Sequence, residues 1–461
     1  MLIYEIEEVS NMVFKRKIYD KMLEWKQLSN GQTALLVEGA RRIGKSTIVE
    51  LFAQNEYEDY IILDFAKEEK DVKQNFEDNI GDMDTFFRNL FLLKGKTIPE
   101  RKSVIIFDEV QLFPLARQAI KYLVQDGRFD YIETGSLISI KKNVQNILIP
   151  SEEYKLKMFP MDFEEFLWAK NDMVTAPTIR EAYIKRKALG DAIHRKIMQS
   201  FRTYMVVGGM PQAVQAFVSG KNYKEIDFVK RNILSLYEDD LRKYDEDNRE
   251  KASIIFKTIP EQLENHNSHF KFSLVDKNAR YKNYVDAVSF VAESMIGNEC
   301  LNVTAPDVSL EAYADRSNFK LYMGDTGLLI TQIMKNSDET TEDLYKSIIF
   351  DKLGINQGTV IENVVAQMLR AKGYDLYFHE FMHSAEGAGK DKKYEIDFLI
   401  VRKRKVCPIE VKSSSYKNHK SFDLFAKKYP IKLEDKFIIY AKDLKHEEGI
   451  LYIPLYMTMC L

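Results

Sequence analysis

Short apolar runs alternate with amphipathic stretches along the N-terminal part of the chain. Continuous apolar runs at residues 33–38, 60–65 and 103–107 predict strands that are covered on both faces of a sheet. Amphipathic segments at residues 14–28 and from about 71 to 93 predict helices. Strands that alternate with helices in this order predict an α/β fold built on a parallel sheet.

A glycine-containing segment follows the first predicted strand and leads into a helix. It consists of Gly39, Ala40, Arg41, Arg42, Ile43, Gly44, Lys45, Ser46 and Thr47. A strand, a glycine-rich loop and a helix in this order are the setting of a phosphate-binding loop, or Walker A motif. Its backbone N–H groups cradle phosphate oxygens, Lys45 brings positive charge to the β and γ phosphates, and the Ser46 hydroxyl is a magnesium ligand. The segment therefore predicts binding of ATP with Mg²⁺; a glycine-rich turn with a surface lysine is the alternative.

Two carboxylates, Asp108 and Glu109, follow the apolar run at residues 103–107. The carboxyl end of a strand in a parallel sheet lies beside the phosphate loop, so we expect both side chains there. Asp108 is then expected to bind Mg²⁺, and Glu109 to orient and polarise the attacking water. A surface turn is the other interpretation.

Small polar residues end a further predicted strand at residues 129–133. The hydroxyl groups of Thr134 and Ser136 either sense the γ-phosphate during catalysis or cap the following turn. Both interpretations remain open.

The middle of the chain, from residue 178 to 244, is predicted to be helical, and residues 208–211 (Gly-Gly-Met-Pro) interrupt it as a hinge or a tight turn. Three helices followed by short strands over residues 251–325 suggest a winged helix. A DNA-binding winged helix is expected to be basic, yet residues 261–321 hold six Lys or Arg against nine Asp or Glu. We therefore expect this region to dock a protein partner.

Residues 357–461 form a separate predicted unit that contains a second set of ionisable residues. Asp397 lies in one predicted strand, Glu410 and Lys412 in the next, and Glu362 in a helix before them. Two carboxylates can hold Mg²⁺, and a lysine can position or deprotonate water for attack on a phosphodiester. This arrangement resembles the restriction-endonuclease active site of the PD-(D/E)xK type. A half-exposed sheet with charges on its wet face is the other interpretation.

The composition is that of a soluble globular protein of two to four domains. The 461 residues are 45% hydrophobic and 30% charged, with a net charge of −3, so no global field indicates a nucleic-acid or membrane partner. Three widely spaced cysteines, Cys300, Cys407 and Cys460, fit neither a disulfide framework nor a zinc site and predict a reducing cytoplasm. No apolar run approaches the ~18 residues of a membrane span.

The phosphate loop, the run at residues 107–111 and the segment 134–136 resemble the AAA-type ATPases of bacteria and archaea. Residues 159–166 and 208–211 are similar to the subgroup in which the ATPase precedes an uncharacterised C-terminal region. The resemblance implies four parts: an ATPase core (1–172), a helical lid (173–250), a winged-helix-like domain (251–334) and a restriction-endonuclease-like α/β domain (343–461). Where many relatives carry a Gly-Arg pair, residues 149–152 differ, so no trans-acting arginine is assigned.

These features predict a magnesium-dependent, ATP-binding and ATP-hydrolysing AAA-type protein whose nucleotide state is coupled to its C-terminal domain. An ATP-regulated nuclease acting on DNA or RNA through that domain is one alternative. An ATP-dependent protein-binding switch with a catalytically inactive nuclease-like domain is another. Oligomer formation is left open.

Overall fold

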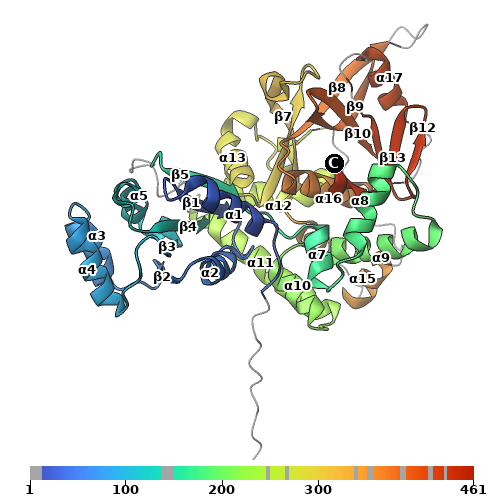
Figure 1. The fold of residues 1–461 in the computed structure, drawn as a ribbon. Helices are drawn as coiled ribbons and strands as arrows, with labels where there is room; N and C mark the ends of the chain where they lie inside the picture. The colour runs from blue at the N-terminus through green and yellow to red at the C-terminus, as the bar shows by residue number, and fades with distance from the viewer. Residues whose placement is uncertain are drawn as a thin grey trace, which may run out of the picture. The chain divides into compact units, whose positions relative to one another are not determined.

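The computed structural model describes residues 13–136, 150–244, 250–264, 269–336, 341–349, 357–384, 391–413, 419–429, 433 and 435–461. The chain forms two compact units, and each has a sheet of its own (Figure 1). The first unit contains the described residues before Gly39, residues Gly44–Gly135 and those from 150 to Lys157. The second contains Gly39–Ile43, Ser136 and the described residues from Met158 to Leu461.

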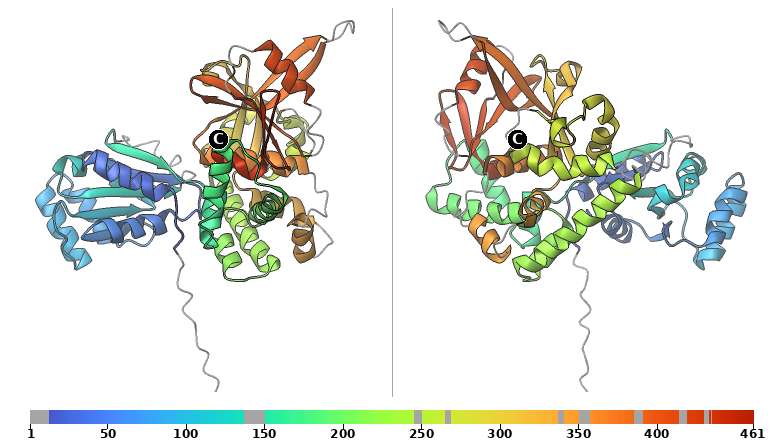
Figure 2. Two further views of the ribbon diagram at one scale, coloured as in Figure 1. Left: turned by 45° about the vertical axis from the view of Figure 1, so that its right-hand side comes forward. Right: turned by 180° about the vertical axis from the view of Figure 1, so that it is seen from behind.

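A five-stranded sheet with helices on both faces forms the first unit (Figure 2). Its strands are β1 (Ala34–Gly39), β2 (Asp59–Asp64), β3 (Ser103–Asp108), β4 (Asp130–Ser136) and β5 (Glu153–Lys157). Its helices are α1 (Ile18–Ser29), α2 (Lys45–Glu56), α3 (Lys70–Asn79), α4 (Met83–Lys94), the 3-10 turn η1 (Val110–Leu112) and α5 (Pro114–Asp126). The strand order is β2-β3-β4-β1-β5, with parallel pairing of β2 with β3, β3 with β4 and β1 with β5. The predicted α/β class with a parallel sheet is confirmed.

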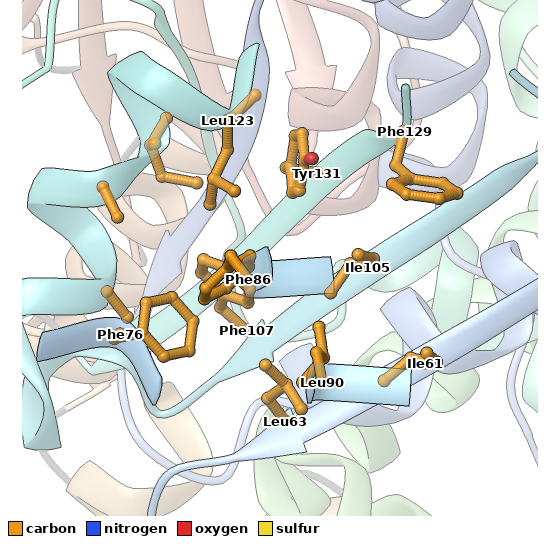
Figure 3. Close-up of a cluster of buried hydrophobic side chains, with 14 of the residues drawn as sticks. Ile61, Leu63, Phe76, Phe86, Leu90, Ile105, Phe107, Leu123, Phe129 and Tyr131 are labelled. Carbon is orange, nitrogen blue, oxygen red and sulfur yellow. The ribbon is translucent and has the colours of Figure 1, made fainter. Parts of the chain in front are cut away.

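Aromatic and branched side chains pack on the sheet of the first unit. Figure 3 labels ten members of this core: Ile61, Leu63, Phe76, Phe86, Leu90, Ile105, Phe107, Leu123, Phe129 and Tyr131. The Phe107 ring meets the rings of Phe65 and Phe76 edge to face, each at a centroid distance of 5.7 Å. Phe107 immediately precedes Asp108, so this packing fixes the end of β3.

The single helical segment expected from about residue 71 to 93 is two helices in the structure, α3 and α4. Asp82 is the N-cap of α4, and its side chain accepts a hydrogen bond from the backbone N–H of Thr85 at 3.2 Å. An aspartate cap satisfies N–H groups that a new helix leaves unpaired, so it favours a fresh start at this point.

Helices make up much of the second unit. They are α7 (Phe163–Ala169), α8 (Thr175–Lys185), α9 (Asp191–Val207), α10 (Pro211–Val218), α11 (Tyr223–Tyr244), α12 (Lys251–Glu264), α13 (Val285–Glu293), α14 (Thr326–Ile333), α15 (Thr341–Ile349), α16 (Gln357–Ala371) and α17 (Lys420–Lys428). Short 3-10 turns are η2 (Phe272–Leu274), η3 (Tyr281–Asn283), η4 (Leu310–Tyr313), η5 (Met334–Asn336) and η7 (Leu455–Cys460). In the part of the chain that the structure describes, no helix combines the length and the apolar character needed to cross a membrane.

A mixed eight-stranded sheet runs through the second unit in the order β12-β13-β11-β10-β9-β8-β6-β7. Its strands are β6 (Gly297–Val303), β7 (Ala314–Met323), β8 (Leu376–Ser384), β9 (Asp391–Arg402), β10 (Lys405–Val411), β11 (Phe437–Tyr440), β12 (Lys445–Glu447) and β13 (Ile450–Pro454). β6 pairs antiparallel with β7 and parallel with β8. Through β8 the sheet continues antiparallel into β9 and β10.

The domain boundaries expected after residue 172 stay a prediction. Residues 173–250, 251–334 and 343–461 were expected to be three domains; in the structure their described residues belong to one compact unit, together with Met158 and the segment after it. The strands expected in a separate winged helix, β6 and β7, extend the same sheet as β8. The paired residues of β6 and β8 lie 76 positions apart in the chain (376 − 300), so local patterning gives no sign of this pairing.

The glycines at 208 and 209 form a tight turn between α9 and α10. Gly208 has φ 84°, a value that favours glycine. At Gly209 an added Cβ would lie 2.1 Å from the carbonyl oxygen of Met161, so no larger residue fits. The backbone N–H of Gly209 also donates to Oδ2 of Asp325, at 2.6 Å. The turn therefore depends on close backbone contact with two distant segments.

Replacing Gly209 with alanine is expected to destabilise the second unit by about 3 kcal/mol, because the new methyl group must displace the Met161 backbone. Chemical denaturation of the Gly209→Ala variant measures this. Gly81→Ala is the matched control, since a Cβ at Gly81 meets no atom within 4 Å, and its effect is expected to stay within about 0.5 kcal/mol. Equal stability of the two variants would contradict the account of this turn.

Candidate functional site

The glycine-containing segment forms a loop between β1 and α2, as predicted. β1 ends at Gly39, and α2 begins at Lys45, whose side chain is 6% exposed. Gly44, with φ 91°, and Arg42, with φ 68°, have left-handed backbone conformations. Left-handed residues in a loop bring successive N–H groups to one side and create a concavity that binds anions. The N-terminus of α2 adds the positive end of a helix dipole.

Only glycine fits at the first position of the loop, Gly39, because neighbouring atoms lie very close to its backbone. A Cβ at Gly39 would lie 2.5 Å from the carbonyl oxygen of Met158 and 2.4 Å from Cδ1 of Ile43. Real Cβ atoms do not approach other atoms this closely, so a larger side chain would displace the backbone that shapes the loop.

Three oxygen-bearing side chains converge beside α2. The Ser46 hydroxyl donates a hydrogen bond to Oδ1 of Asp108 at 2.7 Å. Thr134 Oγ1, which is fully buried, donates to the same Asp108 oxygen. β3 and β4 are neighbours in the sheet, so residues from these two strand ends and from the start of α2 meet here. A hydroxyl and a carboxylate oxygen at this separation form a donor set suited to a hard divalent cation such as Mg²⁺.

Glu109 is held in an unusual backbone conformation next to this group. Its φ of 54° lies in the left-handed region, which costs a non-glycine residue free energy. Its backbone N–H donates to Oγ1 of Thr134 at 3.3 Å, and its carboxylate accepts a hydrogen bond from Gln111. Two flanking contacts thus fix both the backbone and the side chain of Glu109.

Ser136, the other hydroxyl predicted here, lies at the end of β4 and is 4% exposed. Its buried hydroxyl has no hydrogen-bond partner among the residues that the structure describes. The structure therefore brings Thr134 to Asp108, but it gives Ser136 no comparable contact.

Two residues of α11 hold the phosphate loop within the second unit. The Arg41 guanidinium contacts both carboxylate oxygens of Asp240, at 2.9 and 3.0 Å. The buried Tyr237 hydroxyl donates to the carbonyl oxygen of Arg41 at 2.8 Å. Both partners lie almost 200 residues beyond Arg41, so neither could be found from local sequence.

The sequence offers Arg231, Arg242 and Arg249 as candidate phosphate sensors without singling one out. In the structure the first two pair with acidic residues of α11. Arg231 forms an ion pair with Asp227 one helical turn earlier, at 2.5 Å. Arg242 lies 3.6 Å from Asp239, within the same helix. Arg249 lies outside the described residues.

The four residues predicted to form a nuclease-like site come together in the second unit. Asp397 is on β9, and its Oδ2 accepts a hydrogen bond from the Val411 N–H at 2.7 Å. Lys412 follows β10, and its Nζ is 2.5 Å from Oε1 of Glu410. Glu362, on α16, is close enough to Asp397 for the two charges to interact. These four residues, together with Glu395, Lys320 and Tyr322 described below, are called the carboxylate cluster.

Burial raises the pKa of three side chains in the cluster to about 7: Glu362, Glu395 and Glu410. The nearby charge of Asp397 adds to each increase, and the pKa of Asp397 is itself raised by burial. Ammonium groups act in the opposite direction, from Lys320 on Glu362 and Glu395 and from Lys412 on Glu410. The cluster therefore concentrates negative charge that favours a cation.

Two members of the cluster lie on β7, outside the region predicted for this site. Lys320 forms an ion pair with Glu395, and the Tyr322 hydroxyl donates to Oε2 of Glu362 at 3.3 Å. Glu395 lies two residues before Asp397 on β9 and so shares its face, but no local signal in the sequence points to β7. Within the described ranges, no group of three or more His, Cys, Asp or Glu side chains is arranged to hold a metal ion.

Comparison with protein families divides the chain into three matched regions. Residues 31–167 match a family described as an AAA domain. Residues 198–339 and 357–457 match two families described as domains of unknown function (DUF8612 and DUF4143, respectively). No curated protein matches the chain.

Solved structures with some similarity to the chain include three proteins. The RuvB Holliday junction branch migration motor of Thermotoga maritima is 13% identical, with 62% of this chain and 89% of that chain covered and a TM-score of 0.28. Domain III of the replication initiation protein DnaA from the same organism is 16% identical, with 45% and 84% covered and a TM-score of 0.24. A signal transduction ATPase with numerous domains from Pyrococcus horikoshii is 10% identical, with 75% and 47% covered and a TM-score of 0.27.

The AAA domain match covers the loop, Asp108 and Thr134. Together with the contact between Ser46 and Asp108, it supports ATP binding and hydrolysis by residues 31–167. This part of the chain is thus similar to AAA-type P-loop ATPase domains.

Proposed function

We propose that this protein is a magnesium-dependent AAA-type ATPase whose nucleotide state is coupled to its C-terminal nuclease-like region. The observation that carries the proposal is the 2.7 Å hydrogen bond between Ser46 and Asp108 beside the phosphate loop. Chance matches to a glycine-rich loop motif occur, but a carboxylate on the adjacent strand end is what phosphoryl transfer requires.

In this proposal the loop N–H groups and Lys45 bind the phosphates of ATP, while Ser46 and Asp108 hold Mg²⁺. The cation neutralises charge on the β and γ phosphates when it is bound. The low exposure of Lys45 supports its role, because a buried ammonium group gains most from a charged partner.

Glu109 is proposed to accept a proton from the attacking water and to orient it. The contacts with Gln111 and Thr134 support this role, since they hold the carboxylate in place before any substrate arrives. Thr134 is proposed to position Asp108 and to sense the γ-phosphate. Ser136 is retained as a weaker candidate for the same task.

Coupling to the C-terminal region is proposed to pass through α11. Asp240 holds the Arg41 side chain and Tyr237 holds the Arg41 carbonyl group, so a nucleotide that reshapes the loop must act on this helix. Tyr237 also contacts the sulfur of Met210, at 3.9 Å, in the turn whose Gly209 is bound by Asp325. Within the second unit, these contacts connect Arg41 of the loop with α11 and with the turn at Gly209.

A nuclease that is regulated by ATP is the second candidate function. The carboxylate cluster favours it, because Asp397 and Glu410 could take a divalent cation while Lys412 positions water for attack on a phosphodiester. Glu410 is buried, and Glu362, Asp397 and Lys412 are half-buried, which also argues against a simple solvent-exposed sheet face.

The Lys45→Ala variant is expected to bind ATP at least about 100-fold more weakly, equivalent to about 3 kcal/mol, because the phosphates lose their fixed positive charge. Titration calorimetry with a non-hydrolysable ATP analogue measures the loss. Lys102→Ala, which removes an exposed lysine of the same unit, is the control and should bind as the wild type does. Unchanged affinity in Lys45→Ala would refute the assignment of the loop.

The Glu109→Gln variant is expected to bind ATP normally and to hydrolyse it roughly 100- to 1,000-fold more slowly, because the amide cannot accept the water proton. Single-turnover assays with radiolabelled ATP measure hydrolysis, and gel filtration shows whether ATP stays bound. Turnover within threefold of the wild type would remove Glu109 from the mechanism.

If the second candidate function holds, the purified chain cleaves DNA or RNA with Mg²⁺, and Lys412→Ala reduces the rate by at least about 100-fold. Assays with and without ATP, on single- and double-stranded substrates, measure cleavage. Lys427→Ala, an exposed lysine on α17, is the control. Cleavage that persists in Lys412→Ala would indicate a different site or a contaminating enzyme.

A further inference from the structure

A lysine from outside the predicted nuclease-like region lies among the carboxylates of the cluster. Lys320, on β7, has its Nζ atom 2.5 Å from Oε1 of Glu395. Its side chain is only 9% exposed, and Nζ lies 5.1 Å from the centre of the Phe378 ring. An ammonium group taken out of water is costly unless it is paired, so the carboxylates account for its position.

The same strand provides a second contact with the cluster. Tyr322 lies two residues after Lys320 and therefore on the same face of β7. Its hydroxyl donates to Oε2 of Glu362 at 3.3 Å. β7 thus provides one cation and one hydrogen-bond donor to the carboxylates on its side of the cluster, Glu395 and Glu362.

The other two carboxylates are held by β10 and the residue after it. Asp397 accepts a hydrogen bond from the Val411 N–H, and Lys412 pairs with Oε1 of Glu410. Glu410 is only 5% exposed, and its Oε2 atom is buried and has no hydrogen-bond partner among the described residues; Oε2 of Glu395 is also buried without such a partner. A buried carboxylate oxygen without a partner leaves a place for a cationic ligand.

The charges of the cluster do not balance. Once a bound cation has displaced their protons, four carboxylates face two ammonium groups: Glu362, Glu395, Asp397 and Glu410 against Lys320 and Lys412. The two remaining negative charges equal the charge of one divalent cation. Without Lys320 there would be three, and the cluster would attract cations more strongly.

We propose that Lys320 is an intrinsic counter-ion of the carboxylate cluster. Its ammonium group takes the place of a second divalent cation, so that the cluster binds only one. Its ammonium group holds Glu395 and neutralises the side of the cluster that faces β7. Asp397 and Glu410 remain to bind the single cation. This inference rests on the nuclease-like site proposed above, but it concerns cation binding and holds whether or not nucleic acid is cleaved.

Binding of Mn²⁺ to the full-length chain, stripped of metal with EDTA and free of nucleotide, tests the proposal. The electron paramagnetic resonance signal of free Mn²⁺ gives the number and affinity of bound ions. Lys320→Met removes the charge and Lys320→Arg retains it. The Asp397→Asn variant measures the Mn²⁺ that binds outside the cluster, and this amount is subtracted from the binding of the other variants.

Lys320→Met is expected to bind one Mn²⁺ more than the wild type, or the same ion at least about tenfold more tightly, because the cluster gains one negative charge. Lys320→Arg should behave as the wild type. The double variant Lys320→Met with Glu395→Gln restores the charge balance and should return to wild-type binding. Mn²⁺ should also raise the melting temperature of Lys320→Met more than that of the wild type.

Equal numbers and affinities of bound Mn²⁺ in the wild type and Lys320→Met would overturn the proposal. So would a Lys320→Met chain that is unfolded and that Mn²⁺ does not restore, since that result indicates a purely structural lysine. No nucleic acid is present, so these outcomes are independent of the cleavage assay. A site that binds Mn²⁺ as expected but never cleaves would remove the nuclease function and leave the role of Lys320 intact.

Discussion

The hydrogen bonds that Ser46 and Thr134 donate to Asp108 are the constraint on which the first unit depends functionally. They join residues from the start of α2, the end of β3 and the end of β4, so they form only if the strands lie in the observed order. That order is stabilised by buried aromatic rings around Phe107, directly before Asp108. Packing of the sheet therefore sets the geometry of the proposed catalytic site.

Contacts between distant segments also hold the second unit together. Gly209 meets the Met161 backbone and is bound by Asp325, while Arg41 of the phosphate loop is held by Asp240. Each contact joins segments that lie far apart in the chain. Because these contacts hold the helical region firmly, it is suited to transmit a conformational change of the phosphate loop. A loosely attached lid would move without passing the change on.

Local sequence was sufficient to predict the elements whose signal is local. The apolar runs of β1 and β3, the glycines of the loop and Asp108 lie within short segments, and the structure places them as expected. The four predicted members of the carboxylate cluster also come together, although their chemical role stays a prediction.

What could not be predicted depends on pairings between distant segments. β6 and β7 were expected in a separate winged helix, but they join the sheet of β8 through contacts that no local pattern encodes. For the same reason the sequence did not indicate that Lys320 would pair with Glu395, or Asp240 with Arg41.

The central claim is that Ser46 and Asp108 act together on one Mg²⁺ bound to ATP. A double-mutant cycle with Ser46→Ala and Asp108→Asn, read as affinity for Mg²⁺ and a non-hydrolysable ATP analogue, tests it most directly. The account predicts that the double variant loses little more affinity than either single variant, with a coupling energy of about 1 to 3 kcal/mol. Losses that simply add would show that the two residues act independently, and would contradict the account.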